Sequence, residues 1–100
     1  MPFHIDASDK PGVRDLRASV RPDHLAFLAE NTSRLLAAGA KLDDDGNAFG
    51  SVYIVDVEDR AAAEAFIHSD PYSKAGVFGE IVVTRWRKAI FNFERVPPKA

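Results

Sequence analysis

Two side chains of this sequence could together move a proton, although they stand far apart in the chain. His24 follows Pro22 and Asp23, and Asp70 is followed directly by Pro71. An imidazole exchanges its proton near neutral pH, and a carboxylate that holds one ring nitrogen leaves the other free to react. If the fold joins them, the pair predicts a general acid or base for proton abstraction beside a carbonyl, for elimination or for isomerisation. In the structural alternative, His24 is a capping or pairing residue and Asp70 caps the turn at Pro71.

Five further polar side chains are candidates for binding a substrate. Ser51 begins an apolar stretch and could hydrogen-bond in the same pocket, whereas a nucleophilic role is not expected because no G-x-S-x-G elbow surrounds it. Tyr72 could donate a hydrogen bond to a substrate oxygen, or it could simply pack. Arg14, Arg17 and Arg21 could pair with a substrate carboxylate through their guanidinium groups, or they could form a solvated basic loop.

The acidic run 43–46 has a superficial likeness to a calcium loop. Aligning its glycine with the loop glycine of such a site places Val52 where a bidentate Glu is required. The run is therefore predicted to be a hairpin turn. His4 and His68 have no metal-ligand spacing with His24, and no glycine-rich phosphate loop is present. We expect neither a metal nor a cofactor.

Length and composition restrict the class of protein. One hundred residues make one domain, and a net charge of −2 argues against a nucleic-acid partner. The chain has no cysteine, which excludes a thiolate nucleophile and fits a cytoplasmic setting. No apolar run approaches the ~18–20 residues of a membrane span, and the N-terminus lacks the charged and then apolar pattern of a signal peptide, so no processing is expected. A single-domain cytoplasmic protein without a membrane or nucleic-acid partner is expected.

Hydrophobic spacing predicts six elements in the order strand, helix, strand, strand, helix, strand. The expected ranges are 2–7, 22–39, 41–42, 50–57, 60–69 and 80–88. This order is the ferredoxin-like βαββαβ pattern of the α+β class, in which both helices cover one face of a four-stranded antiparallel sheet.

The first helix depends on two local signals and one pattern. Pro22 suits a first helical position, and Gly39 suits a helix end. Apolar residues within 25–36 recur at helical spacing and predict a buried stripe. The preceding stretch 13–20 is then a loop with at most a turn or two of helix. Asp59 is predicted to cap the second helix.

The strands 50–57 and 80–88 are apolar on both faces, which two helices on one side of a sheet cannot cover. Another subunit is therefore expected on the second face, so that the protein is a homodimer formed through its sheet. Residues 89–100 are a C-terminal extension with an isoleucine and two phenylalanines. Exposed phenylalanines are unfavourable, and we expect the extension to pack on something such as a partner chain.

Several segments resemble one family. The run Arg21-Pro22-Asp23-His24-Leu25-Ala26-Phe27-Leu28 resembles the RPxHLxxL segment of YciI-like (YCII-related) proteins. Further segments are similar to the family's other signatures: Asp9-Lys10-Pro11-Gly12, Ala38-Gly39-Ala40, Gly50-Ser51, Asp70-Pro71-Tyr72 and Ala75-Gly76-Val77. The resemblance covers nearly the whole chain. It implies a dimeric α/β barrel in which two sheets meet face to face, with a His–Asp active site at His24 and Asp70.

The same resemblance narrows the activity without naming one reaction. Most family members have no assigned reaction, whereas a few relatives act in aromatic-ring degradation, for example by eliminating chloride from a ring-cleavage product. The fold is shared with muconolactone isomerases. The leading hypothesis is a small cofactor-independent enzyme that uses His24 and Asp70 on a small oxygenated or anionic ring or ring-cleavage compound. The rival hypotheses are a non-catalytic dimeric module that binds a small molecule, and an interaction partner of a larger enzyme.

Overall fold

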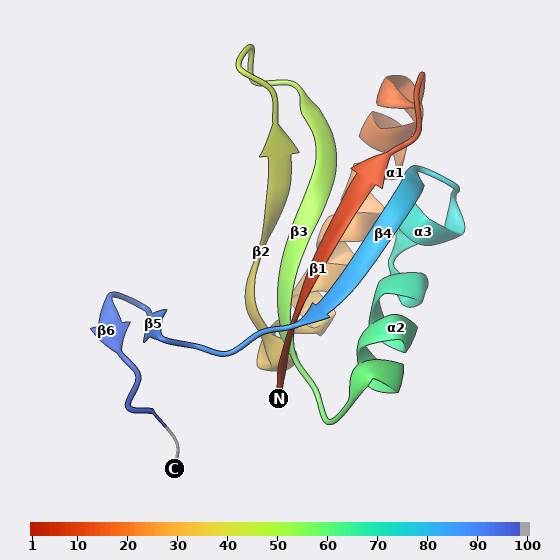
Figure 1. Ribbon diagram of the computed structural model, residues 1–100. Helices are drawn as coiled ribbons and strands as arrows, with labels where there is room; N and C mark the ends of the chain where they lie inside the picture. Colours follow the sequence, from red (N-terminus) through yellow and green to blue (C-terminus); the bar gives the residue numbers. More distant parts are fainter. Residues whose placement is uncertain (99–100) are drawn as a thin grey trace.

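The computed structural model describes residues 1–98, which form a four-stranded antiparallel sheet with helices packed on one face (Figure 1). The elements are β1 (Pro2–Asp9), α1 (Arg14–Glu30), η1 (Thr32–Arg34), β2 (Leu35–Leu42), β3 (Ala48–Asp56), α2 (Arg60–Ser69), α3 (Pro71–Lys74), β4 (Phe78–Arg85), β5 (Ile90–Phe91) and β6 (Glu94–Arg95). The strand order is β2-β3-β1-β4. The expected βαββαβ succession is confirmed.

The core lies between the sheet and the helices. Phe3, Ile5 and Ala7 alternate along the central strand β1, and each is at most 1% exposed. Tyr53 on β3 packs edge-on against Phe66 of α2, with 5.7 Å between the ring centroids. Because alternate residues of a strand point to opposite faces, one row of each strand builds this core and the other row faces away from the helices.

The first helix begins at Arg14 and not at Pro22, so the loop predicted over 13–20 is wrong. Pro22 lies inside α1. The preference of proline for a first helical position is a weak local signal, and tertiary contacts override it here. Those contacts come from Arg17, whose buried guanidinium bonds to Asp9 and Ser51. They hold the first turns of the helix against the sheet.

The first helix also ends earlier than predicted, at Glu30. Asn31 Nδ2 donates a hydrogen bond of 2.7 Å to the carbonyl of Phe27 at this end. Residues 35–42, which the spacing assigned largely to the helix, form β2 and pair with β3. The predicted buried stripe is therefore wrong, and Leu25 is 44% exposed. Cross-strand pairing decides the conformation where leucine spacing is compatible with both structures.

The acidic run forms the predicted hairpin turn between β2 and β3. The carboxylate of Asp43 accepts hydrogen bonds of 3.0 and 2.9 Å from the backbone N–H groups of Asp45 and Asn47. The Asn47 N–H is the main reason why the pKa of Asp43 is lowered. Gly46 completes the turn with φ +86°. Within residues 1–98, no group of three or more His, Cys, Asp or Glu side chains could hold a metal ion.

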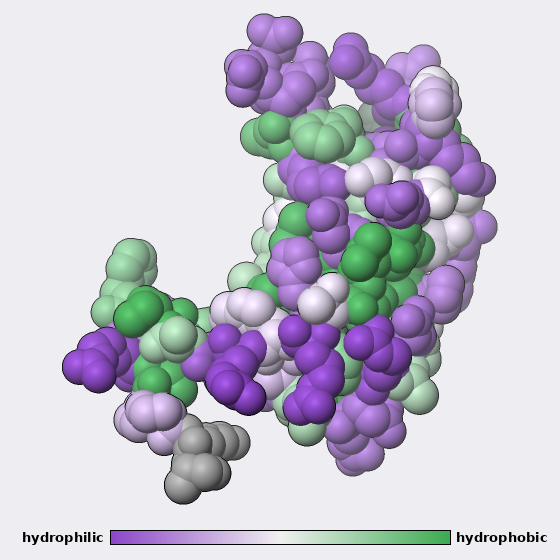
Figure 2. All heavy atoms as spheres, in the orientation of Figure 1, coloured by the Kyte–Doolittle hydropathy of each residue, from purple (hydrophilic) through white to green (hydrophobic). Residues whose placement is uncertain are grey.

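The face of the sheet that points away from the helices is uncovered in this chain (Figure 1). Val52 and Ile54 of β3 are partly exposed there, and Val82 of β4 is 47% exposed. Polar groups interleave with them, since Lys41 Nζ donates to Asp6 Oδ1. Figure 2 shows this mixture of hydrophobic and hydrophilic residues over the sheet. The fourth strand of the sheet, β4, ends at Arg85, before the end predicted at residue 88.

Beyond β4 the chain leaves the sheet and forms the small β5–β6 hairpin (Figure 1). Ile90 is 60% exposed and Phe93 is fully exposed. The predicted extension 89–100 is thus a projecting hairpin over its described part, and its last two residues lie outside the described residues. Among the helices in residues 1–98, none has the length and apolar character needed to cross a membrane.

Candidate active site

Asp70 is the buried centre of the site and has no solvent exposure. It ends α2 and caps α3, since Pro71 occupies the first helical position and the Tyr72 N–H donates to Asp70 Oδ1 at 2.8 Å. A residue before proline avoids helical geometry, which explains the break between the two helices at this point. The structural role expected for Asp70 as a cap is therefore present. It occupies only part of the carboxylate's capacity to accept hydrogen bonds.

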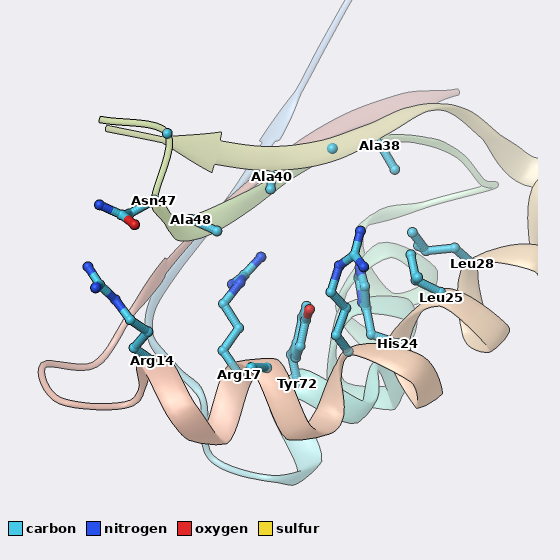
Figure 3. A pocket seen from close by; sticks show the side chains of 14 residues that line it. Arg14, Arg17, His24, Leu25, Leu28, Ala38, Ala40, Asn47, Ala48 and Tyr72 are labelled. Atoms are coloured by element: carbon cyan, nitrogen blue, oxygen red, sulfur yellow. The ribbon is translucent and has the colours of Figure 1, made fainter. Parts of the chain in front are cut away.

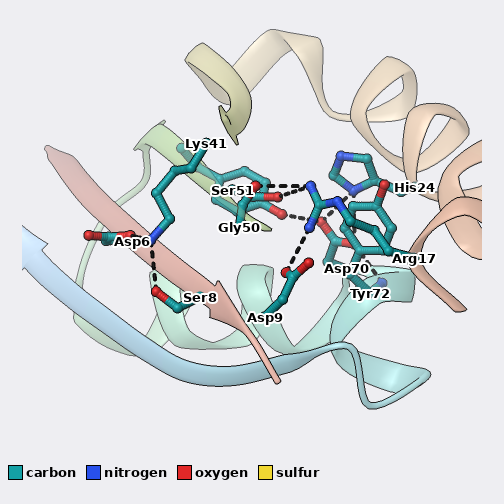
Figure 4. A network of polar contacts seen from close by, with 11 residues as sticks. Asp6, Ser8, Asp9, Arg17, His24, Lys41, Gly50, Ser51, Asp70 and Tyr72 are labelled. Atoms are coloured by element: carbon teal, nitrogen blue, oxygen red, sulfur yellow. Dashed lines mark hydrogen bonds and ion pairs between the residues drawn. The ribbon is translucent and has the colours of Figure 1, made fainter. Parts of the chain in front are cut away.

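The carboxylate of Asp70 also contacts His24 and Tyr53 (Figure 4). Nδ1 of His24 lies 3.0 Å from Oδ1 and 2.9 Å from Oδ2. The Tyr53 hydroxyl donates to Oδ2 at 2.6 Å. Burial and the neighbouring charge of Asp70 raise the pKa of Tyr53 far above its usual value, so the phenol remains a donor. Three donors thus surround a buried carboxylate and stabilise its charge.

This arrangement determines which nitrogen of His24 can act. An ionised carboxylate only accepts hydrogen bonds, so Nδ1 carries a hydrogen toward Asp70. Nε2 then remains free to take up or release a proton. The His24 ring is 7% exposed and lines the cavity described below. The Tyr72 ring stacks on it at 4.0 Å between centroids, and the Tyr53 ring lies edge-on at 6.3 Å.

Arg17 supports the opposite face of Tyr72. Its guanidinium carbon lies 4.4 Å from the Tyr72 ring centroid, so the phenol is held between a guanidinium and an imidazole. Arg17 forms an ion pair of 2.8 Å with Asp9 and donates a hydrogen bond of 2.9 Å to Ser51 Oγ. Burial raises the pKa of Asp9, and the charge of Arg17 opposes that rise. The fold therefore commits Arg17 to internal contacts.

An open cavity of about 410 Å³ lies between α1 and the hairpin formed by β2 and β3 (Figure 3). The main lining side chains from α1 are Arg14, Arg17, Arg21, His24, Leu25 and Leu28. Those from the other side include Ala38, Ala40, Asn47 and Ala48. No acidic residue is among the lining residues within the described chain. The cavity is thus suited to an anionic ligand.

The walls of the cavity also restrict the shape of a ligand. Ala38 and Ala40 of β2 pair with Tyr53 and Ser51, so they point to the helix side of the sheet. Their short side chains leave a low wall opposite the arginines of α1 (Figure 3). Leu25 lines the cavity near His24 and adds an apolar surface. A small, flat and oxygenated anion would match this combination of small walls and positive charge.

The structure brings most of the predicted site residues together. His24 and Asp70 are in direct contact, and Tyr72, Arg14 and Arg21 line the cavity beside them. Ser51 does not line the cavity. It is 2% exposed, and its hydroxyl accepts a hydrogen bond from Arg17.

Two members of the polar network were missed from the sequence, Tyr53 and Asp9. Tyr53 lies among aliphatic residues of a strand and was interpreted as a core residue only. A buried tyrosine needs a partner for its hydroxyl, and that requirement was the available signal. Asp9 was noted as part of the family signature Asp9-Lys10-Pro11-Gly12, and nothing local in the sequence indicates its contact with Arg17.

Comparisons with known proteins agree on one family. The model of the YCII-related domain matches residues 1–87. Protein YciI of Escherichia coli is 38% identical over 96 residues, covering 88% of this chain and 98% of that protein. An uncharacterized protein of Haemophilus influenzae is 37% identical over 98 residues, with the same coverage of 88% and 98%.

Two solved structures are similar to this chain. The 5-chloro-2-hydroxyhydroquinone dehydrochlorinase of Burkholderia phenoliruptrix, in complex with 2,5-dihydroxybenzoquinone, superposes with a TM-score of 0.81 and 32% identity. The match covers 87% of this chain and 94% of that one. An antibiotic biosynthesis monooxygenase has a TM-score of 0.52 at 15% identity, with coverage of 88% and 100%, and shares the fold.

Proposed function

The chain belongs to the YCII-related family, and from this premise we propose that it is an enzyme acting on a small, anionic or oxygenated ring or ring-cleavage compound. The reaction class is elimination or isomerisation, with His24 as the group that transfers the proton. The observation that carries the proposal is the contact of His24 Nδ1 with both oxygens of the buried Asp70 carboxylate. The similarity to a dehydrochlorinase of a hydroquinone supports the substrate class.

The proposed elimination follows from the orientation of His24. Nε2 accepts a proton from a hydroxyl or carbon of the bound compound, and the electron pair of the broken bond forms a new double bond. The leaving group, such as chloride, departs with its own bonding pair. The imidazolium that results is stabilised by Asp70, whose carboxylate is held in place by Tyr53. An isomerisation would return the proton from Nε2 to a different atom of the substrate.

The arginines of the cavity have a separate role in this proposal. Arg14 and Arg21 are exposed residues of α1 that line the cavity, and neither forms a hydrogen bond or ion pair among the described residues. Their guanidinium groups are thus available for oxyanions of a ligand. Arg17 has its donors occupied by Asp9 and Ser51, so we assign it to the support of the Tyr72 ring.

The direct test measures chloride release from 5-chloro-2-hydroxyhydroquinone. His24→Ala should lower kcat/KM by at least about 10²-fold, because general acid–base catalysis commonly contributes that much. Replacing the exposed histidine, His68→Ala, is the matched control and should leave the rate unchanged, since His68 lies outside the cavity and forms a surface ion pair with Glu64 on its own helix. Equal rates for wild type and His24→Ala would rule out the proposed proton transfer.

A binding measurement distinguishes the enzyme from a non-catalytic module. Calorimetric titration with 2,5-dihydroxybenzoquinone should give a Kd that rises about tenfold in Arg21→Ala, as expected for the loss of one charge-assisted contact. The non-catalytic alternative predicts the same binding. The non-catalytic alternative differs in predicting that the wild-type protein turns over no ring compound of this class. It also predicts that His24→Ala binds 2,5-dihydroxybenzoquinone with the wild-type Kd.

We propose in addition that the protein is a homodimer formed through the open face of its sheet. The support is the row of Val52, Ile54 and Val82, which are partly or largely exposed on a face that no helix of residues 1–98 covers. Such a patch is typical of surfaces that bury another subunit. Sedimentation equilibrium should give twice the chain mass. Ile54→Asp should shift the protein to the monomer, and a wild-type monomer at all concentrations would refute this arrangement.

A further inference from the structure

The segment after β4 carries an apolar tip. We use the term C-terminal arm for residues 88–98, which contain the β5–β6 hairpin and project from the body of the protein (Figure 1). Phe93 at the tip is fully exposed, and Ile90 is 60% exposed. Figure 2 shows hydrophobic residues on this projecting part of the chain, beside the body of the protein. A large apolar side chain that is fully exposed to water buries no apolar surface, so it contributes no hydrophobic stabilisation to its own chain.

The backbone of the tip adds a second observation. Asn92 and Phe93 form the two-residue loop of the hairpin, with φ of 52° and 66°. Two-residue hairpin loops with positive φ at both positions favour Asn and Gly. A phenylalanine is a poor choice for this conformation because its Cβ crowds the backbone. The backbone conformation at residue 93 favours glycine. The presence of an aromatic ring there therefore indicates that the ring contacts something outside the hairpin.

Charge separates the arm from the rest of the chain. The C-terminal arm contains two cationic side chains, Lys88 and Arg95, and one carboxylate, Glu94, whereas residues 1–84 contain eight cations and fourteen carboxylates. The arm is therefore positive and the body negative. The YCII-related match ends at residue 87, so the arm is an addition to the family domain. A positive arm with an apolar tip complements the acidic body of another molecule of the same protein.

We propose that the C-terminal arm docks its tip on a second copy of this chain and extends the interface at the open sheet face. The chain leaves the sheet at Arg85, the end of β4, shortly before the arm begins at Lys88, and β4 contributes Val82 to that face. Arm and sheet face therefore form one continuous surface that a single partner can cover. Anionic lipid could satisfy the charge of the arm, but it would not explain why the adjoining sheet face is also apolar.

The test places the photo-crosslinker p-benzoylphenylalanine at residue 93 of the full-length protein. Irradiation of the pure protein should give a covalent product of twice the chain mass, with the crosslink mapped by mass spectrometry to residues 1–87 of the second copy. Phe93→Ser should raise the dimer Kd at least about tenfold in sedimentation velocity, as expected for an interface aromatic. Higher NaCl concentration should weaken the wild-type dimer more than it weakens the double variant Lys88→Gln and Arg95→Gln, which lacks the cations of the arm.

The controls separate this contact from general effects of surface change. Leu16→Ser removes another exposed apolar side chain, on α1, and should leave the dimer Kd unchanged. The proposal is overturned if irradiation gives no intermolecular product, or if Phe93→Ser has the wild-type Kd. It is also overturned if the arm crosslinks only to vesicles containing phosphatidylserine. A dimer that survives Phe93→Ser unchanged would leave the sheet-face interface standing while refuting the role of the arm.

Discussion

The hydroxyl of Tyr53 allows a quantitative test of the buried network. Tyr53→Phe removes the 2.6 Å hydrogen bond to Asp70 together with the interaction of the hydroxyl with Ser51, and it keeps the ring that packs edge-on against Phe66. A hydrogen bond to a charged group contributes about 1.5–3 kcal/mol to stability. Asp70 is completely buried, so water cannot replace the lost donor. We expect the free energy of unfolding to fall by about 2 kcal/mol.

The assay is urea unfolding at one fixed protein concentration, followed by circular dichroism. A loss of about 2 kcal/mol corresponds to a decrease in Tm of roughly 8–16 °C for a domain of this size. Tyr72→Phe is the matched control, because no described hydrogen bond involves the Tyr72 hydroxyl, and its effect should stay within about 0.5 kcal/mol. ¹⁵N NMR of the His24 ring should show hydrogen on Nδ1 in the wild type.

The result that would refute this reasoning is equal stability of Tyr53→Phe and wild type. It would mean that Asp70 either is not charged in the folded protein or gains nothing from its third donor. A loss of stability as large in Tyr72→Phe would also contradict it, since the effect would then not belong to the hydrogen bond. Hydrogen on Nε2 instead of Nδ1 would remove the basis for the proton transfer proposed for His24.

Three further predictions concern other parts of the molecule. Gly50→Ala should lose about 1–3 kcal/mol in urea unfolding, because the added methyl group would overlap the Lys41 side chain and the Ala7 carbonyl, whereas Gly39→Ala has open space and should be neutral. Ala40→Leu should raise the Kd for 2,5-dihydroxybenzoquinone at least about tenfold by filling the cavity, with stability unchanged. The pKa of Asp43 is lowered in the folded protein. Its contribution to stability should therefore be complete above the unfolded pKa of ~3.9 and should disappear as the pH falls through the folded pKa. Asp43→Asn should remove this pH dependence when unfolding is followed in acid titrations.

The sequence allowed those residues of the candidate site to be predicted whose side chains have a distinctive chemistry. His24 was selected because an imidazole exchanges its proton near neutral pH, the family resemblance implied its pairing with Asp70, and their contact is present. Ser51 shows the limit of that approach. A hydroxyl at the start of a strand could belong to the cavity or to the core, and only the position of Arg17 determines which occurs.

Local sequence signals were sufficient to predict those elements whose stabilising hydrogen bonds are formed by neighbouring residues. The alternation of Phe3 and Ile5 defines β1, and Asp59 caps α2 by accepting a hydrogen bond of 2.8 Å from the Ala62 N–H. The turn at Asp43 similarly satisfies its own backbone groups. In the cap and the turn, the stabilising hydrogen bond joins residues only a few positions apart. The sequence pattern therefore contains the residues that cause the structure.

Only the tertiary structure decided the elements that depend on distant partners. The cap of α1 is Val13, which offers no side-chain hydrogen bond, and the start of the helix depends instead on the buried contacts of Arg17. Residues 35–42 become a strand because β3 supplies their hydrogen bonds, and this change turns Ala40 toward the cavity. At these positions the free energy of contacts between segments far apart in the chain outweighs the local preference for helix or loop. A pattern within one segment cannot show those contacts.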